Sequence, residues 1–326
     1  MGWIRDRNWE MNGEESKKII MGSFAQLKGH FHAVANIEAE ELTESNLEQD
    51  MSCALFVYVE GYPDSEIYPA FFNKYERVVV RSINEERESG AVLENGRPGL
   101  LRLFYQKPSK NCIFIADSDF DRLMAVSGEE SRAQEGLFFT DYHDLEIEIY
   151  SFDTRAVQKL YETKIIVFSK IRYNVFRLNE LKEKGELPQE LRSWKVFRWK
   201  KENGYRKYVD KCRVDENIEN VLTTIISEQD DNSDYNNIRK ELLKEPECCH
   251  LKKNEIPYQL VNGHNYESFL KKNRFDTQNI KIKYMRYSGF VMPMYQKISE
   301  YIRNHYPEIR NRSQTKKESG SNWSFA

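Results

Sequence analysis

The sequence predicts an α/β protein with a parallel sheet flanked by helices, followed by a mainly helical carboxyl-terminal region. Three observations lead to this prediction. Short, continuous apolar runs, typical of strands buried on both faces, occur between residues 51 and 152. Helical patterns separate these runs, and this alternation is typical of a parallel three-layer unit with right-handed connections. From residue 153 to residue 309 the helical pattern dominates.

The strands of the expected sheet can be placed individually. They are expected at Leu55–Val59, Val78–Val80, Cys112–Ala116 and Gly136–Thr140. The helix after the first strand contains Pro69, which removes a helical hydrogen bond, so this helix is kinked or starts late. A short helix over Leu100–Tyr105 is expected to precede the third strand.

The remaining chain divides into an amino-terminal part, a helical part and a tail. Residues 1–50 have a polar, mostly helical pattern, and residues 310–326 have the composition of a disordered tail. The clearest helices are expected at Ala156–Tyr173 and at Pro293–His305, the second with proline in its first turn. Between them, residues 194–213 read as a hairpin that turns at Asn-Gly.

Composition limits the class of protein. The chain has 326 residues and a net charge of −3, so only a local patch could bind nucleic acid by charge. No apolar run approaches the length of a membrane span, and the first residues lack a secretory pattern. Five cysteines without an even, spaced pattern indicate reduced thiols. We therefore expect a cytoplasmic protein that has no contact with a membrane.

Carboxylates follow two of the predicted strands directly. Glu60 comes after the first strand, and Asp117, Asp119 and Asp121 come after the third. In an open parallel sheet, functional groups collect beyond the carboxyl ends of the strands, so these side chains would converge if the two strands are neighbours. The alternative is that the aspartates are ordinary loop and helix-capping residues.

A third acidic segment follows the last predicted strand and contains Asp141, Asp144 and Glu146, with His143 among them. Clustered carboxylates repel each other unless a cation neutralises them. Hard oxygen ligands without a majority of histidine or cysteine favour Mg²⁺ or Mn²⁺. His143 could transfer protons in such a site, or it could be a packed histidine beside it.

The stretches V-E-G-Y-P-D, from Val59, and I-A-D-S-D-F-D, from Ile115, together resemble the TOPRIM fold of primases, topoisomerases and overcoming-lysogenisation-defect nucleases. The T-D-Y-H-D-L-E segment from Thr140 and V-N-G-H-N-Y-E-S-F-L from Val261 are similar to the AriB-type effectors of the PARIS anti-phage systems. Asn265 departs from that pattern, which has aspartate there, and we interpret His264 as a structural residue at a helix start.

This resemblance implies a metal-dependent endoribonuclease toxin of antiviral defence that cleaves host tRNA. It also implies that an AriA-like ATPase partner binds the protein. After release from this partner, the active protein would be a homodimer. Catalytic roles are implied for Glu60, Asp117, Asp119 and Glu146, and metal binding for Glu60, Asp117, Asp119 and Asp121. Asp144 and His143 would be auxiliary. Asp64 matches a primase-like acidic position, and we expect it to cap the following helix.

A basic segment could supply the surface for nucleic acid. Residues 192–213 contain nine Lys or Arg residues against two acidic ones, and aromatic residues, including Trp194, lie among them. Such a surface suits phosphate contacts and base stacking. The candidates for these contacts are Arg198, Lys200, Lys201, Arg206 and Lys207. The alternative is a half-buried hairpin whose aromatic side chains pack inside.

Two other functions remain open at this point. The protein could be a non-catalytic TOPRIM-like module whose acidic cluster binds a basic partner. A TOPRIM nuclease could also act on DNA, because DNA and RNA have the same phosphodiester group.

Overall fold

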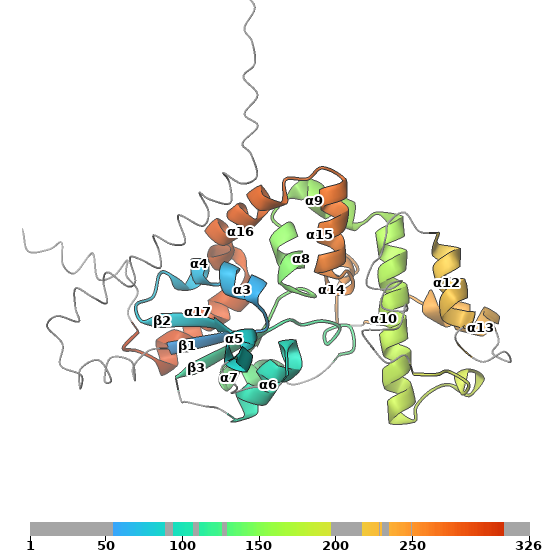
Figure 1. Ribbon diagram of the computed structural model, residues 1–326, viewed down its shortest axis with the longest axis horizontal. Coiled ribbons are helices and arrows are strands. Elements are labelled where there is room, and N and C mark those ends of the chain that lie inside the picture. Colours follow the sequence, from blue (N-terminus) through green and yellow to red (C-terminus); the bar gives the residue numbers. More distant parts are fainter. Residues whose placement is uncertain are drawn as a thin grey trace, which may run out of the picture. The chain divides into compact units, whose positions relative to one another are not determined.

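The computed structural model describes residues 55–88, 94–106, 111–125, 129–196, 217–227, 229, 235–248 and 250–309. Four strands form one sheet, β1 (Leu55–Val59), β2 (Val78–Ser82), β3 (Cys112–Ala116) and β4 (Leu137–Phe139). Their order is β2-β1-β3-β4, and all neighbouring strands are parallel (Figure 1). The predicted α/β class and parallel sheet are confirmed, and β1 and β3 have the predicted bounds.

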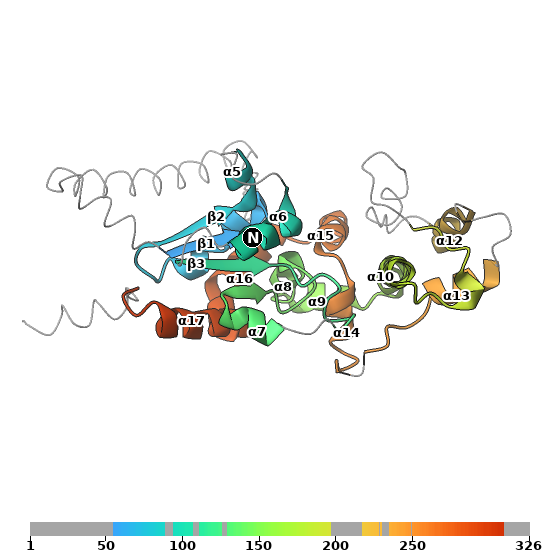
Figure 2. The same cartoon turned by 90° about the horizontal axis from the view of Figure 1, so that it is seen from below.

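The sheet is covered on both faces because residues of each central strand alternate between two hydrophobic cores. Leu55, Val57 and Val59 of β1 belong to one core, which also contains residues of helices from the end of the described chain. Phe56 and Tyr58 point to the other core, which contains residues of α6 (Gly96–Gln106). Period-two alternation of this kind gives the three layers visible in Figure 2.

The connection from β1 to β2 is broken at its proline, as predicted. Helix α3 (Tyr62–Ile67) ends before Pro69, and α4 (Pro69–Phe72) begins at it. The connection from β2 to β3 contains α5 (Ile83–Glu88) and α6. Helix α6 begins at Gly96 and not at Leu100, so the prediction placed its start one turn too late. Helix α7 (Glu129–Gln134) precedes β4.

The last helices of the described chain complete the core of the sheet. They are α8 (Leu145–Tyr150), α9 (Thr154–Leu160), α14 (Ile256–Leu260), α15 (Gly263–Lys272), α16 (Thr277–Val291) and α17 (Pro293–His305). Side chains of α8, α15, α16 and α17 share one hydrophobic core with β1 and β3. A boundary at residue 152 therefore does not separate two cores, although the region is mainly helical as predicted.

A third core lies along the long helix α10 (Thr163–Lys184). It contains side chains of α12 (Ile218–Ser227) and α13 (Tyr235–Leu242), together with Leu191 of the short 3₁₀ turn Gln189–Leu191 and Trp194. The expected single helix over 156–173 is in fact two helices, α9 and α10, separated at Tyr161 and Glu162.

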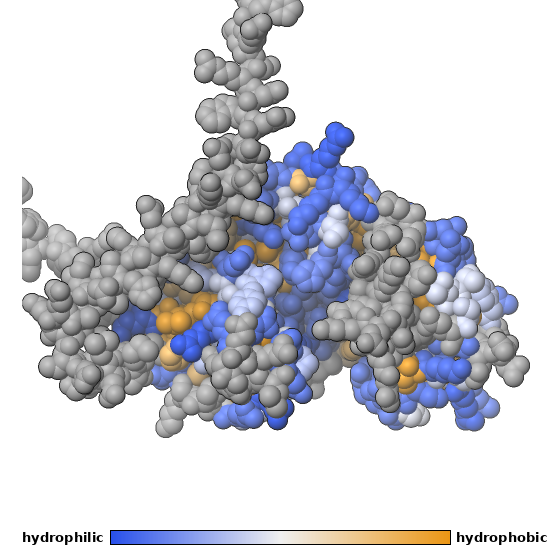
Figure 3. Space-filling model, viewed as in Figure 1, coloured by the Kyte–Doolittle hydropathy of each residue, from blue (hydrophilic) through white to orange (hydrophobic). Residues whose placement is uncertain are grey.

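Residues 1–54 and the expected tail 310–326 lie outside the described residues. On the face shown in Figure 3, most of the described surface is hydrophilic. No helix among the described residues is long and apolar enough to cross a membrane.

Candidate functional site

Acidic residues follow the carboxyl ends of β1, β3 and β4, and α6 and α8 also begin near these strand ends. We call this group the acidic edge. It consists of Glu60, Asp64, Asp117, Asp119, Asp121, Asp144 and Glu146. Parallel strands deliver these residues to one side of the sheet, since the ends of β1, β3 and β4 all lie there.

The ends of β1 and β3 are joined directly. The two strands are neighbours, with Val59 opposite Ile115. The backbone N–H of Asp117 donates a hydrogen bond to Glu60 Oε1 over 2.8 Å. The predicted convergence of Glu60 and Asp117 is therefore confirmed.

Asp64 joins this pair from the first turn of α3. Its Oδ2 accepts a hydrogen bond of 2.9 Å from the N–H of Gly61, so the expected helix-capping role is confirmed. Asp117 Oδ1 accepts one of 3.1 Å from the N–H of Leu145. Glu60, Asp64 and Asp117 each use one carboxylate oxygen in this way, and the second oxygen of each accepts no hydrogen bond from the described residues. We call these three residues the open half of the acidic edge.

The electrostatic environment of the open half disfavours negative charge. Burial raises the pKa of Glu60 to about 8, and Asp119 and Asp64 add to this rise. Burial and Glu146 raise the pKa of Asp64 to about 7. Burial, with Glu60 next, raises the pKa of Asp117 well above its usual range. These are the conditions under which a cation would be held strongly.

Asp119 and Asp121 have a different partner, the guanidinium of Arg97. Its Nη1 lies 3.2 Å from Asp119 Oδ2, and its Nη2 forms an ion pair with Asp121 Oδ2. Arg97 Cζ also lies 5.4 Å from the ring centroid of Phe139. We call Asp119 and Asp121 the arginine-paired half.

Arg97 is the functional candidate that the sequence prediction missed. It stands in the first turn of α6, which the prediction started at Leu100. A signal was present, because a helix that connects parallel strands begins at the carboxyl edge of the sheet. A cationic residue at the start of α6 is therefore placed beside the carboxylates that follow β3.

His143 anchors the backbone of Asp119. The N–H of Asp119 donates to the carbonyl of His143 and His143 Nδ1 donates to the carbonyl of Asp119, both over 2.7 Å. Asp119 has a left-handed backbone conformation, with φ of 47°. Arg172 donates to His143 Nε2 over 3.0 Å, and burial together with Arg172 lowers the pKa of His143 to about 4. His143 is thus a buried, neutral packing residue, and its geometry does not support proton transfer.

Asp144 and Glu146 connect β4 to α15. Asp144 caps α8 by accepting from Ile147 N–H over 3.0 Å, and its other oxygen accepts from Gly263 N–H over 2.7 Å. A Cβ at position 263 would lie 2.3 Å from Asp144 Oδ1 and 2.3 Å from the Glu146 Cβ, so only glycine fits there. Asp144 is therefore a structural residue in this arrangement.

His264 lies at the start of α15, as expected, but it is not the residue that caps this helix. Asn262 caps α15, because its side chain accepts from the N–H of Asn265 over 3.2 Å. His264 is exposed, and its Nδ1 lies 3.2 Å from Glu146 Oε1. It therefore belongs to the rim of the acidic edge.

The donor set of the open half fits a hard divalent cation, because three carboxylates each keep one oxygen available and repel each other without a counter-ion. In the arrangement described, no three His, Cys, Asp or Glu side chains among the described residues are already placed to hold a metal ion. The carboxylates would have to draw closer around it.

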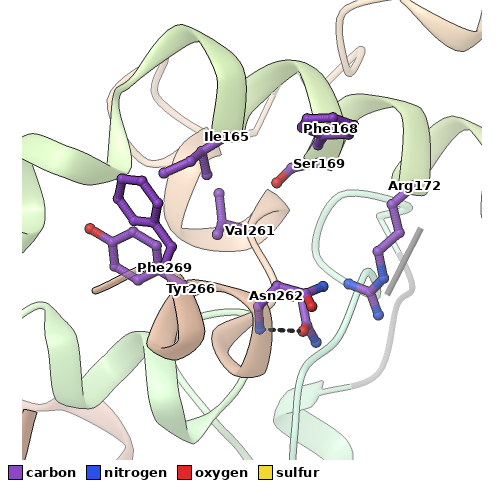
Figure 4. Close-up of a pocket in the computed structure, with 9 residues that line it drawn as sticks. Ile165, Phe168, Ser169, Arg172, Val261, Asn262, Tyr266 and Phe269 are labelled. Carbon is purple, nitrogen blue, oxygen red and sulfur yellow. Dashed lines mark hydrogen bonds between the residues drawn. The ribbon is translucent and has the colours of Figure 1, made fainter. Parts of the chain in front are cut away.

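A small pocket lies between α10 and α15, beside the acidic edge (Figure 4). Arg172 extends into one end of it, and Phe269 lies at the other. Its volume of about 20 Å³ suits one water molecule and is too small for a nucleobase.

The basic segment lies largely outside the described residues, including its candidates Arg198, Lys200, Lys201, Arg206 and Lys207. Trp194, at its start, is described. It is buried, and its Nε1 donates to Asn179 Oδ1 over 3.0 Å. Of the two alternatives for the aromatic residues of this segment, Trp194 fits the second, because its side chain packs inside the protein.

Comparison with known proteins does not assign the chain to a family. No protein-family model matches the chain, and no curated protein matches its sequence.

Proposed function

We propose that the chain is a divalent-metal-dependent phosphodiesterase that cleaves nucleic acid at the acidic edge. The observation that supports the proposal most directly is the hydrogen bond from Asp117 N–H to the Glu60 carboxylate, which ties two neighbouring strand ends into one acidic group. A nucleic acid would be repelled by this edge unless a cation neutralised it. The chemistry of the edge therefore favours a metal-assisted reaction on an anionic substrate.

The residues of the acidic edge have different proposed roles. The open half, Glu60, Asp64 and Asp117, would hold Mg²⁺ or Mn²⁺, and when bound the ion supplies stabilisation of charge on the phosphoryl group. Glu60 orients the attacking water and accepts its proton, since its carboxylate lies at the strand end beside Asp117 and a bound cation would keep it ionised. His143 keeps Asp119 in position through the two backbone hydrogen bonds.

Within this activity, we propose the role of a TOPRIM-type effector of anti-phage defence that cleaves host tRNA. The acidic residues after β1, β3 and β4 stand in the order found in the AriB-type effectors, which supports this assignment. An AriA-like ATPase partner and a homodimeric active form belong to the same proposal. The catalytic role of Glu146 and the basic segment as the contact for substrate are also part of it.

The test is inducible expression in bacteria, with sequencing of the cut nucleic-acid ends. Glu60→Ala is expected to abolish both cleavage and toxicity, because it removes the proton acceptor and a metal ligand. Glu66→Ala is the matched control, since Glu66 is an exposed carboxylate on the same α3 helix, outside the acidic edge.

The cut ends also separate the alternatives. Ends confined to tRNA support the tRNA assignment, whereas ends in DNA identify a DNA-directed nuclease. A Glu60→Ala protein that is still folded and still cuts at the wild-type rate in Mg²⁺ rules out the proposed active site. A wild-type protein that binds no Mn²⁺ and cuts nothing is a docking module.

A further inference from the structure

Arg97 is built into the acidic edge by its position in the fold. Gly96 has a left-handed backbone, with φ of 61°, and begins α6. Arg97 follows in the first turn, and its side chain reaches back across the end of β3 to the residues after Ala116.

The guanidinium is held on several sides. Its two terminal nitrogens pair with separate carboxylates, Asp119 and Asp121, and Nη1 also lies 3.5 Å from the carbonyl oxygen of Ser118. The ring of Phe139 lies alongside, and only 18% of the Arg97 side chain is exposed. Charge-assisted pairs of a partly buried guanidinium are stronger than exposed ones. The pair with Asp121, whose side chain is 22% exposed, is the better shielded of the two, since Asp119 is 47% exposed.

The same two carboxylates are the ones that a second divalent cation would use. The guanidinium lies between Asp119 and Asp121 and neutralises them, which is the electrostatic role of a metal ion between two carboxylates. A second divalent ion would therefore have to displace Arg97, whose charge would then face the ion at short range without its partners. At the open half, by contrast, no Lys or Arg among the described residues forms an ion pair with Glu60, Asp64 or Asp117 within 4.0 Å.

We propose that Arg97 takes the place of a second metal ion, so that the acidic edge binds a single divalent cation at the open half and keeps a guanidinium over Asp119 and Asp121. The inference rests on the proposed metal-dependent function and specifies how many metal ions each chain binds. It also assigns Arg97 as the second positive group near the substrate phosphate, since the planar guanidinium matches phosphate oxygens as well as carboxylates.

The experiment counts the Mn²⁺ ions bound per chain, using equilibrium dialysis with electron paramagnetic resonance of the free ion. The wild-type protein is expected to bind one ion. Arg97→Met, which keeps the length of the side chain and removes its charge, is expected to bind two. Arg97→Lys, which keeps a positive charge, is expected to bind one. The double variant Arg97→Met with Asp121→Asn is expected to return to one, because the second ion loses a ligand.

Three results would overturn the inference. They are a wild-type protein that binds two ions, an Arg97→Met protein that is folded by circular dichroism and still binds one, and a double variant that keeps the second ion. Arg97→Gln replaces the methionine variant if that protein does not fold, and the wild-type count decides independently of both.

Failure of the inference is distinguishable from failure of the proposed function. Two ions in the wild-type protein contradict the role of Arg97 and leave the nuclease proposal intact. Absence of Mn²⁺ binding in the wild-type protein contradicts the proposed function and the inference together.

Discussion

The open half and the arginine-paired half of the acidic edge consist of the same kind of side chain but differ in their electrostatic state. Glu60 and Asp117 lie at the strand ends with backbone N–H groups as their hydrogen-bond partners, and their pKa values are raised. Asp119 and Asp121 lie a few residues further along and are paired with Arg97. One guanidinium therefore separates carboxylates that need a counter-ion from carboxylates that already have one.

The comparison teaches that a pattern of acidic residues does not by itself specify a metal site. The spacing D-x-D-x-D treats Asp117, Asp119 and Asp121 as equivalent. In the fold their functions diverge, because Arg97 arrives from α6, a different segment of the chain. The halves should accordingly respond differently to substitution and to pH.

The largest expected difference in cleavage rate is between the Asp117→Asn and Asp121→Asn variants. Asp117→Asn keeps an oxygen for the N–H of Leu145 but removes charge from the open half, so cleavage should fall by about 10²–10³-fold. Asp121→Asn leaves Arg97 paired with Asp119 and should lower cleavage by no more than about tenfold. Single-turnover rates in Mg²⁺ measure both. Equal losses would remove the distinction between the halves.

A second prediction concerns the wall behind the open half. Gly263→Ala places a Cβ 2.3 Å from Asp144 Oδ1, so the start of α15 must move away from α8. The free energy of unfolding should fall by about 1–3 kcal/mol, as measured by chemical denaturation. Gly61→Ala is the matched control. The nearest atom to its Cβ would be Pro63 Cδ at 3.4 Å, an ordinary contact, so it should leave the free energy of unfolding within about 1 kcal/mol of wild type. Equal losses in both variants would show that the close approach is not responsible.

A third prediction tests the anchoring of the arginine-paired half. His143→Leu removes the donor to the carbonyl of Asp119 and should slow cleavage by about tenfold. Mn²⁺ binding at the open half should be unchanged. His143→Asn, whose amide can donate in place of Nδ1, should restore part of the rate. Full activity in the leucine variant would show that Asp119 needs no such support.

A further prediction concerns the pH dependence of stability in the metal-free protein. Glu60 has a folded pKa of about 8 against an ordinary 4.5, so between these values the folded state holds a proton that the unfolded state has lost. The free energy of unfolding therefore falls as pH rises through this window. His143, with a folded pKa of about 4 against 6.5, gives the opposite slope below pH 6.5.

The decline should consequently be clearest from about pH 6.5 to 8. Thermal melts across this range, with and without Mg²⁺, provide the measurement. Glu60→Gln should reduce the slope, and Mg²⁺ should flatten it, because bound cation favours the ionised carboxylates. Buried Glu148, whose pKa is also raised to about 8, keeps part of the slope in every variant. A slope that is identical in wild type and Glu60→Gln would contradict the electrostatic description of the open half.

The sequence predicted the features that depend on local pattern. The apolar runs of β1 and β3, the break at Pro69 and helix α17 were all placed correctly. The meeting of Glu60 and Asp117 followed from the parallel topology. These predictions succeed because periodicity and backbone restrictions act over a few residues.

Features that depend on distant contacts were not predicted. Trp194 was interpreted from the basic residues around it, but its indole is buried against α10 and α12. Arg97 gave no local signal, because its partners lie more than twenty residues away in sequence. The packing of α15–α17 on the sheet likewise depends on the tertiary fold. Local patterns carry no information about such partners.

The contribution of α17 to the core of the sheet has a consequence for protein synthesis. Met294, Ile298 and Ile302 pack into the same core as β1, and the N–H of Met294 donates to Asp141 over 2.9 Å. A chain still emerging from the ribosome lacks these side chains, so the face of β1 that carries Leu55, Val57 and Val59 is only partly covered until nearly the last described residue is made. Interrupted translation products should therefore be targets for proteases and chaperones, and should lack an assembled acidic edge.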